Sequence, residues 1–335
     1  MTDLTLKRLD PLIREATGAT AWEVVEVVQE LWSGYGRILR VALSSSSRES
    51  IIVKHIAPPG KRHHPRGWTT DRSHQRKVKS YQVETEWYRN WSDRCDETCR
   101  IPAFLTADQS NEETFLLLED LNTSGYPKRF TLPRGAQIES CLTWLAEFHA
   151  TFLGESPTGL WETGTYWHLA TRPDELTALT DGPLRTAAPA LDRLLSKAKY
   201  QTFVHGDAKL ANFCFSPDGS KVAALDFQYV GQGCGMKDVA YFIGSCLDEA
   251  ACEEQETELL DAYFRSLRHS LTSQQKKLDP DAVETEWREL FPVAWTDFHR
   301  FLKGWCPGHW KINSYSERLA REVIARLPSH ETERH

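Results

Sequence analysis

The stretch TFVHGDAKLANFCFSPDGSKVAALDFQ, residues 202–228, carries the most specific pattern in this chain. Two short apolar runs border a segment with Asp207, Lys209 and Asn212, and a second carboxylate, Asp226, follows the later run. Ionised carboxylates beside buried strands cost free energy unless a cation compensates them. Carboxylate and amide oxygens are ligands of Mg²⁺, and a further carboxylate can accept a proton from a hydroxyl group. The pattern therefore predicts a charged reaction centre at the ends of two short strands.

The chain before this stretch is predicted to be rich in strands, because its early apolar runs are rich in β-branched residues and a later run, residues 114–121, looks like a buried strand. We expect strands at residues 22–31, 37–43, 50–56 and 114–121. WSGYG, residues 32–36, is a turn between the first two, and residues 80–91 predict a helix. The first third of the chain is therefore expected to form a small α+β unit.

The chain after residue 121 is predicted to be mainly helical. Residues 140–154 place apolar side chains on one helical face and end at a glycine, which suits a helix stop. Further helices are expected at about residues 237–248 and 250–270, followed by a loop at 273–281. The turn SPDGS joins the two short strands of the opening stretch.

Composition is ordinary for a globular protein. The 335 residues suffice for two domains, with 40% hydrophobic and 26% charged residues. No stretch approaches the roughly 20 apolar residues that cross a bilayer, and the first 18 residues lack the apolar core of a signal peptide. The eight cysteines form no zinc-type set, so we expect reduced thiols in a cytoplasmic protein with no membrane contact.

Charge is distributed unevenly. The net charge is −7, yet residues 54–79 hold eight Lys/Arg and one acid. We interpret this segment as a solvated basic loop, and contact with phosphates or an acidic partner is the alternative. The acidic remainder argues against nucleic acid as the main partner, because phosphate contacts dominate that affinity.

The motif HGDxxxxN followed by DFQ resembles the kinase-fold small-molecule phosphotransferases, which include aminoglycoside phosphotransferases, choline kinases and especially the ecdysteroid-kinase-like family. The resemblance covers about residues 20–330. It implies an α+β, two-lobed protein-kinase-like fold, with a small β-rich nucleotide-binding lobe (residues 1–121) and a larger, mainly helical catalytic and substrate-binding lobe (residues 122–335). It also implies ATP and Mg²⁺ as cofactors.

The family pattern implies Asp207 as the catalytic base and Asn212 and Asp226 as metal ligands. Lys209 is either a surface lysine or, as we favour, a contact to the transferring phosphate. Gln228 is typical of the ecdysteroid-kinase-like branch. The tract GQGCGMKDVAYF, residues 231–242, fits that branch too, with Asp238 bracing the catalytic loop.

The first half resembles the family's nucleotide-binding elements. Lys54 matches the lysine that holds the α- and β-phosphates, and Glu84 matches its ion-pair partner on the helix, with Glu86 the weaker candidate. The backbone of Glu119 and Leu121 in LLLEDL would meet adenine.

The turn WSGYGR resembles the loop whose backbone N–H groups, here of Gly34, Tyr35 and Gly36, would cover the phosphates. It has only two glycines, fewer than the full glycine-rich loop of the family.

Several polar residues have a structural alternative. His149 and His205 are interpreted as packing residues near the catalytic loop. Trp295, Trp305 and Trp310 crowd one segment with Asp297, where aromatic faces and an acid could hold an amine, although a plain core is the favoured interpretation.

These residues together predict an ATP-dependent phosphotransferase that acts on the hydroxyl group of a small molecule. A protein kinase is the first alternative, but only nine residues separate Gln228 from Asp238, with no anchor motif for a peptide. A non-catalytic nucleotide-binding module on this fold and a nucleic-acid binder are the others. The acceptor, the choice between ATP and GTP, the oligomeric state and the role of the basic segment are not set by the sequence.

Overall fold

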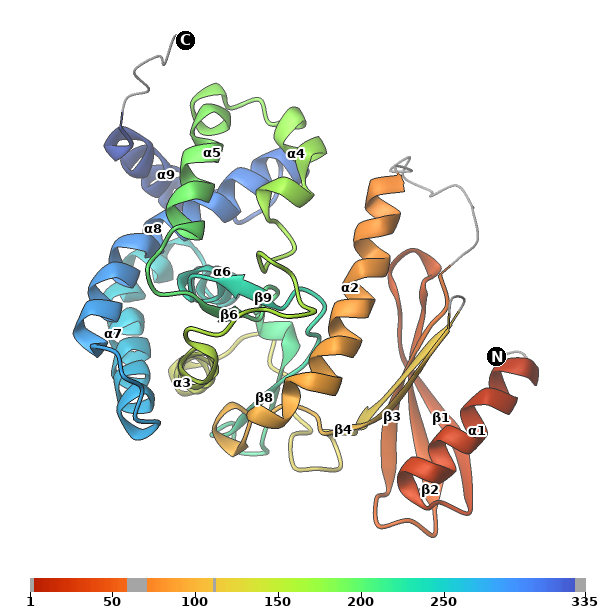
Figure 1. Cartoon of the computed structure of the whole chain (residues 1–335). Coiled ribbons are helices and arrows are strands. Elements are labelled where there is room, and N and C mark those ends of the chain that lie inside the picture. The colour runs from red at the N-terminus through yellow and green to blue at the C-terminus, as the bar shows by residue number, and fades with distance from the viewer. Residues whose placement is uncertain (1–2, 59–70, 111–112, 329–335) are drawn as a thin grey trace. The chain divides into compact units, whose positions relative to one another are not determined.

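The computed structural model of the protein describes residues 3–58, 71–110 and 113–328 (Figure 1). The chain divides into two compact units. The sheet unit comprises Met1–Arg129 and Cys214–Gln228, and the helical unit comprises Phe130–Phe213 and Tyr229–His335. The segment that carries Asp226 is therefore part of the sheet unit, although it follows Asp207 by fewer than twenty residues.

The sheet unit contains a five-stranded antiparallel sheet in the order β1-β2-β3-β5-β4. Its strands are β1 (Ala21–Glu30), β2 (Gly36–Ser44), β3 (Ser50–Ile56), β4 (Phe104–Gln109) and β5 (Thr114–Glu119). Four of these strands confirm the sequence prediction. The pattern did not indicate β4, whose six residues, FLTADQ, are half polar and only partly buried. Helix α1 (Asp3–Thr17) was not predicted either.

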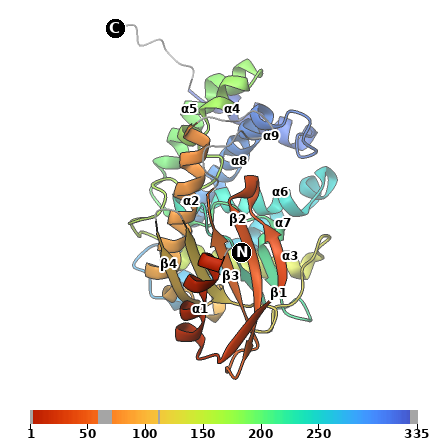
Figure 2. The same cartoon turned by 90° about the vertical axis from the view of Figure 1, so that its right-hand side faces the viewer.

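The two faces of this sheet are covered by different helices, α1 and α2 (Asp71–Asn90), as Figures 1 and 2 show. Ile51 and Val53 of β3 share an apolar cluster with Leu9 and Ile13 of α1. Successive side chains of a strand point to opposite faces, so Lys54 points toward α2. This alternation sends a single charged side chain of β3 to the face where α2 can meet it.

The predicted basic loop at residues 54–79 is wrong at both ends. Residues 54–56 belong to β3, and residues 71–79 form the first half of α2. The part at 59–70 lies outside the described residues. The sequence DRSHQRKVK contains no glycine or proline, and its charges are compatible with a helix whose polar side chains find partners.

The helical unit contains most of the helices. They are α3 (Gly135–Phe152), α4 (Pro173–Ala178), α5 (Gly182–Ser196), α6 (Met236–Cys246), α7 (Glu249–Ser273), α8 (Pro280–Trp305) and α9 (Ser314–Arg326). A short strand β6 (Thr202–Val204) pairs antiparallel with β9 (Gly231–Gly233). The predicted helices correspond to α3, α6 and α7, and the predicted loop separates α7 from α8.

The hairpin around SPDGS is also as predicted, with β7 (Phe213–Phe215) paired to β8 (Val222–Ala224). All eight cysteines are free thiols, and five of them are buried. None of the helices in the described part of the chain combines the length and apolar character needed to cross a bilayer.

Candidate active site

A buried ion pair joins β3 to α2 in the sheet unit. The Nζ atom of Lys54 lies 2.8 Å from Oε1 and 2.7 Å from Oε2 of Glu84, and both residues are buried. Burial raises the pKa of Glu84, and the nearby Lys54 ammonium opposes that rise. The predicted pair therefore forms. The weaker candidate, Glu86, is instead bonded to Asn90 one turn further along the helix.

The Lys54 ammonium also reaches Asp226, at 3.2 Å from Oδ1. The same Oδ1 accepts a 2.6 Å hydrogen bond from the side-chain amide of Gln228. The Gln228 carbonyl in turn accepts from Lys77 Nζ at 3.0 Å and from Ser80 Oγ at 3.2 Å, both on α2. Gln228 therefore orients the Asp226 carboxylate through α2, which is a physical role for a residue that the motif only marked by resemblance.

The backbone at Asp226 is strained. Its φ of +72° lies in the left-handed region, which costs free energy for a non-glycine residue. The next residue, Phe227, stacks on Trp87 with ring centroids 4.8 Å apart and meets the edge of Tyr88 at 6.0 Å. These aromatic contacts hold the strained backbone and fix the direction in which the carboxylate points.

The turn between β1 and β2 is tight. Gly36 has φ +132°, and a Cβ atom there would lie 2.0 Å from the carbonyl oxygen of His55. The N–H groups of Gly34 and Tyr35 donate to the carbonyls of Leu31 and Trp32, at 3.2 and 3.3 Å. Two of the three N–H groups predicted to cover phosphates are thus used within the turn in this structure.

The two residues expected at adenine lie at the end of β5 and directly after it. The carboxylate of Glu119 accepts from Arg100 Nη2 at 2.6 Å and from the Ala103 N–H at 2.8 Å. The carbonyl of Leu121 accepts the N–H of Tyr126 at 2.8 Å. The Glu119 side chain is therefore used inside the protein. Because the Leu121 carbonyl is already bonded to Tyr126, the group that Leu121 could offer to adenine is its N–H.

Asp207 is surrounded by donors in the helical unit. Its Oδ2 accepts from Lys209 Nζ at 2.8 Å and from Asn212 Nδ2 at 3.1 Å. The Asn212 amide also donates to the Asp207 carbonyl at 2.8 Å. Tyr241 donates its hydroxyl to Oδ1 at 3.0 Å. Asp207 is buried, so these donors compensate a carboxylate that would otherwise be costly.

The loop before Asp207 is held by Asp238. This fully buried carboxylate accepts the N–H groups of His205 and Gly206, at 2.5 and 2.9 Å, and lies 3.2 Å from His149 Nε2. Gly206 has φ +79°, and a Cβ atom there would lie 2.2 Å from a backbone oxygen. The predicted bracing by Asp238 is present, and both histidines contact the loop's support, as their structural interpretation requires.

Tyr241 and Tyr166 were missed by the sequence analysis. The Tyr166 hydroxyl donates to Tyr241 at 3.3 Å, so a chain of two hydroxyls ends on Asp207. Burial raises the pKa of both phenols, so both remain donors at neutral pH. Tyr241 lies in the tract GQGCGMKDVAYF, three residues after Asp238 and on the same helical face. This spacing was the only signal in the sequence that placed Tyr241 near the catalytic loop.

The hypothesis that Asp297 holds an amine is not supported. Asp297 is 1% exposed, 2.7 Å from Arg300 Nη2, and accepts from Trp167 Nε1 at 3.1 Å. Trp295 is buried and donates to Ser316, which agrees with the core interpretation. Trp305 and Trp310 are exposed. Helix phase decides this outcome, since it turns Asp297 into the protein interior.

The residues expected at the metal offer suitable donors. Both contacts of the Asn212 side chain to Asp207 use its amide nitrogen, so the amide oxygen points away from them. The Asp226 side chain keeps 28% of its surface exposed. An amide oxygen and a carboxylate match the preference of Mg²⁺ for oxygen ligands. Each of the two residues, taken by itself, therefore offers the kind of oxygen donor that suits this ion.

Comparison with solved structures identifies the fold. The GDP complex of aminoglycoside 2'-phosphotransferase-IIIa is similar over 95% of this chain and 98% of its own, with a TM-score of 0.50 and 11% identity. The microcompartment-associated aminopropanol kinase (12% identical; 96% and 94% covered; TM-score 0.49) and choline kinase LicA from Streptococcus pneumoniae (13%; 96% and 98%; 0.42) are also similar. The likeness shows the fold, which is a two-lobed kinase-like α+β fold.

Sequence comparison then narrows the resemblance for one segment. Residues 174–276 match the model of the Ecdysteroid kinase-like family. This segment contains Asp207, Asn212, Asp226 and Asp238. The predicted resemblance to this group is therefore confirmed. No curated protein matches the chain in sequence.

Proposed function

We propose that this protein transfers the γ-phosphoryl group of ATP to a hydroxyl group of a small molecule. The observation that carries the proposal is the position of the Lys54 ammonium, which lies 2.7 Å from Glu84 and 3.2 Å from Asp226. In kinase-type phosphoryl transfer, a lysine–glutamate pair and a metal-binding aspartate are both required. A purely structural pair would not need a second, partly exposed carboxylate beside the same ammonium.

In this proposal the sheet unit binds the nucleotide. The Lys54 ammonium neutralises charge on the α- and β-phosphates, and Glu84 keeps it in place. The carbonyl of Glu119 accepts from the adenine amino group, and the N–H of Leu121 donates to the ring. The backbone of Gly34, Tyr35 and Gly36 contacts the phosphates, which requires the Gly34 and Tyr35 N–H groups to leave their bonds within the turn.

Asp226 and Asn212 would hold Mg²⁺, which supplies charge neutralisation on the β- and γ-phosphates when it is bound. The chain's own contribution is orientation. Gln228 directs the Asp226 carboxylate, and Asp207 directs the Asn212 amide. A nucleotide is bound in one protein with a similar fold, the GDP complex of aminoglycoside 2'-phosphotransferase-IIIa.

Asp207 would act as the general base. Its Oδ1 is held by Tyr241 and its Oδ2 by Asn212, so its position is set before a substrate hydroxyl arrives. Lys209 bonds to the same carboxylate, while 40% of its side chain is exposed. We therefore assign Lys209 to the transferring phosphate. In this role its ammonium would leave the Asp207 carboxylate and bind an oxygen of the phosphoryl group.

The test is substitution of Asp207 by asparagine, with ADP release measured over a panel of hydroxylated metabolites. Loss of a general base lowers the rate by about 10²–10⁴-fold, so we expect that loss with nucleotide binding retained. Asp93→Asn, at an exposed carboxylate of the sheet unit, is the matched control and should keep the wild-type rate.

Calorimetry with ATP and with GTP, each with and without Mg²⁺, tests the metal ligands. We expect Asp226→Ala to abolish the Mg²⁺-dependent part of nucleotide affinity and Asn212→Ala to weaken it. A wild-type rate in Asp207→Asn, or unchanged metal dependence in Asp226→Ala, would show that the assigned roles are wrong.

A further inference from the structure

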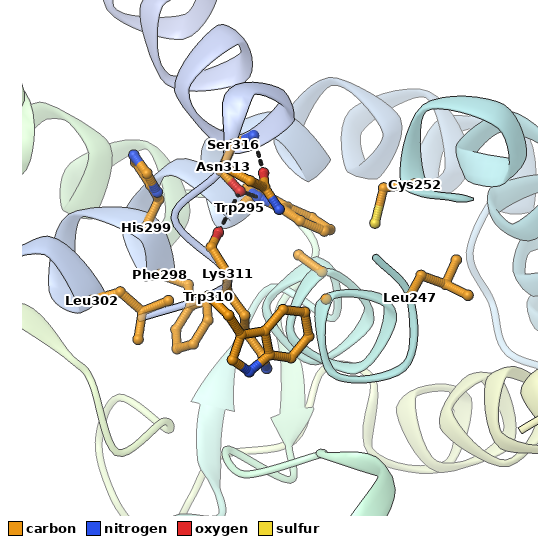
Figure 3. Close-up of a pocket in the computed structure, with 12 residues that line it drawn as sticks. Leu247, Cys252, Trp295, Phe298, His299, Leu302, Trp310, Lys311, Asn313 and Ser316 are labelled. Carbon is orange, nitrogen blue, oxygen red and sulfur yellow. Dashed lines mark hydrogen bonds between the residues drawn. The ribbon is translucent and has the colours of Figure 1, made fainter. Parts of the chain in front are cut away.

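Lys311 lies among aromatic rings in a pocket of the helical unit (Figure 3). Its Nζ atom is 5.0 Å from the ring centroid of Tyr241, 5.5 Å from that of Trp310 and 5.6 Å from that of Phe298. Aromatic faces attract a cation, but three such contacts replace only part of the hydration that an ammonium loses on burial. An anionic group close to the Lys311 ammonium would therefore stabilise its charge.

The neighbouring cations of α8 are compensated differently. Arg300 pairs with Asp297 at 2.7 Å, and Lys303 lies 2.7 Å from both Asp181 and Glu317. Within residues 3–58, 71–110 and 113–328, no carboxylate lies within 4.0 Å of the Lys311 ammonium. Burial lowers the pKa of Lys311 to about 8, so the side chain is still mainly charged at pH 7.

The backbone of Lys311 is fixed. Its carbonyl accepts the hydroxyl of Ser316 at 2.9 Å, and its N–H donates to His309 Nδ1 at 3.2 Å. Figure 3 shows Lys311 beside Trp310, with Asn313 and Ser316 drawn above them. A lysine on a held backbone can present its ammonium at a defined place, as a recognition residue must.

One side chain connects this pocket to the candidate base. The Tyr241 ring lies under the Lys311 ammonium, and the hydroxyl of the same ring donates to Asp207 Oδ1 at 3.0 Å. A compound about as long as a tyrosine side chain could thus meet both residues, with a hydroxyl at one end and a different group at the other.

We propose that Lys311 selects the acceptor, and that the acceptor is an acidic, ring-bearing alcohol whose carboxylate or sulfate pairs with this ammonium while its ring packs on Trp310, the exposed one of the three aromatic rings. This inference rests on the proposed function. A carboxylate on the ligand supplies the missing anionic partner, and planar apolar groups stack on aromatic side chains. A polycationic or quaternary-ammonium acceptor would instead place like charges together in a poorly solvated pocket.

The experiment compares matched acceptors that share one hydroxylated aromatic skeleton and differ in one substituent. The substituents are a carboxylate, its neutral methyl ester and a trimethylammonium group. KM and kcat are measured by ADP release, and affinity is measured separately by calorimetry. The proteins are the wild type, Lys311→Met, Lys311→Arg and the control Lys199→Met. Met keeps the apolar stem and removes the charge, and Lys199 is an exposed lysine 4.9 Å from a tyrosine ring.

We expect the acid to bind the wild type more tightly than its ester by on the order of tenfold to a hundredfold, as for hydrogen bonds to charged groups. Lys311→Met should lose that preference, Lys311→Arg should keep part of it, and Lys199→Met should keep all of it. The change should appear in KM and affinity more than in kcat.

Two results would overturn the inference. One is wild-type preference for the trimethylammonium compound, and the other is an acid preference that survives in Lys311→Met. The failure of the proposed function looks different: the acid then binds in a Lys311-dependent way in calorimetry, but no compound is phosphorylated. That result would support the anion pocket and reject the phosphotransferase.

Discussion

Buried ionisable residues in this protein are compensated in different ways, and the difference separates structural positions from candidate functional ones. Arg300 has one carboxylate partner, Asp297, and both are almost fully buried. Lys54 has two carboxylate partners, and the second, Asp226, is partly exposed. The Arg300–Asp297 pair is closed to solvent, so we interpret it as a structural pair. The Lys54 ammonium contacts a partly exposed carboxylate, so a ligand that approaches Asp226 could also meet this ammonium.

His299 is a buried residue that faces a carboxylate shared with a lysine, and its titration makes the free energy of unfolding depend on pH. It is 1% exposed, and its Nε2 lies 3.4 Å from Glu317, whose carboxylate also binds Lys303. Burial lowers the pKa of His299 to about 4, and this effect outweighs the carboxylates of Glu317 and Asp181, which raise the pKa. An unfolded histidine titrates near pH 6.5. Between pH 6.5 and 4 the unfolded chain therefore binds a proton that the folded chain excludes.

We predict that the free energy of unfolding contains a His299 contribution that is present above pH 6.5 and is lost as pH falls to 4. Its size is up to about 3 kcal/mol. Urea unfolding at pH 7.5, 5.5 and 4.5 measures it. His299→Gln should show a smaller loss over this range than the wild type, whereas the exposed control His269→Gln should match the wild type. Equal pH dependence in both variants would contradict the prediction.

At the scale of single elements, the turn between β1 and β2 shows how a glycine can be required by space and not only by conformation. Gly34 and Gly36 both have positive φ, +73° and +132°. A Cβ atom on Gly34 would meet nothing within 4 Å, but on Gly36 it would lie 2.0 Å from the backbone oxygen of His55. The second glycine allows β2 and β3 to approach each other at the position where Gly36 pairs with Ile56.

We predict that Gly36→Ala destabilises the protein by about 3 kcal/mol or more, because the clash involves backbone that cannot move without breaking the ladder. Gly34→Ala, the matched control in the same turn, should cost about 1–2 kcal/mol from its left-handed backbone alone. Denaturant unfolding of both variants checks this. Equal losses for the two variants would mean that the turn relaxes and the close approach is not required.

Elements also differ in how well their ends could be predicted. The strands β1, β2 and β3 were indicated by β-branched runs and β5 by a short apolar run, and both signals depend on local pattern alone. Helix α2 begins at Asp71, nine residues before the predicted start, because its first half consists of polar residues with no apolar period. Those residues are helical where partners exist, as Lys77 shows by contacting Gln228 and the Tyr81 ring.

At the scale of the whole molecule, the question is whether the acceptor is a protein or a small molecule. The backbone of residues 229–232 is bonded within the helical unit. Thr165 donates to Tyr229, Trp161 to Val230 and Gly164 to Gln232, at 3.1, 3.2 and 2.8 Å. The first four residues after Gln228 are therefore already paired on these carbonyls, so they do not offer a free strand edge to an extended peptide.

We predict that the protein phosphorylates small hydroxylated molecules and does not phosphorylate peptides. Radiolabelled ATP is incubated with the protein, with a degenerate serine, threonine and tyrosine peptide library in one arm and a metabolite panel in the other. Label should appear only in the metabolite arm and should disappear with Asp207→Asn. Robust peptide labelling without a labelled metabolite would reverse this assignment.

The sequence by itself determined the features that are carried by short stretches of chain. The interval between Asp207 and Asn212, the DFQ segment and the strand around Lys54 indicated the fold through their resemblance to the kinase-fold small-molecule phosphotransferases. The same resemblance favoured Glu84 over Glu86 as the ion-pair partner of Lys54.

Only the tertiary structure decided which side chains from distant elements meet. Asp297 and Lys311 are both charged residues close to tryptophans in the sequence, yet Asp297 is paired inside the core and Lys311 lies in a pocket without a carboxylate partner among the described residues. Tyr241 reaches Asp207 across more than thirty residues of chain. Such contacts depend on helix phase and on the packing of side chains across elements, and neither is encoded in local spacing.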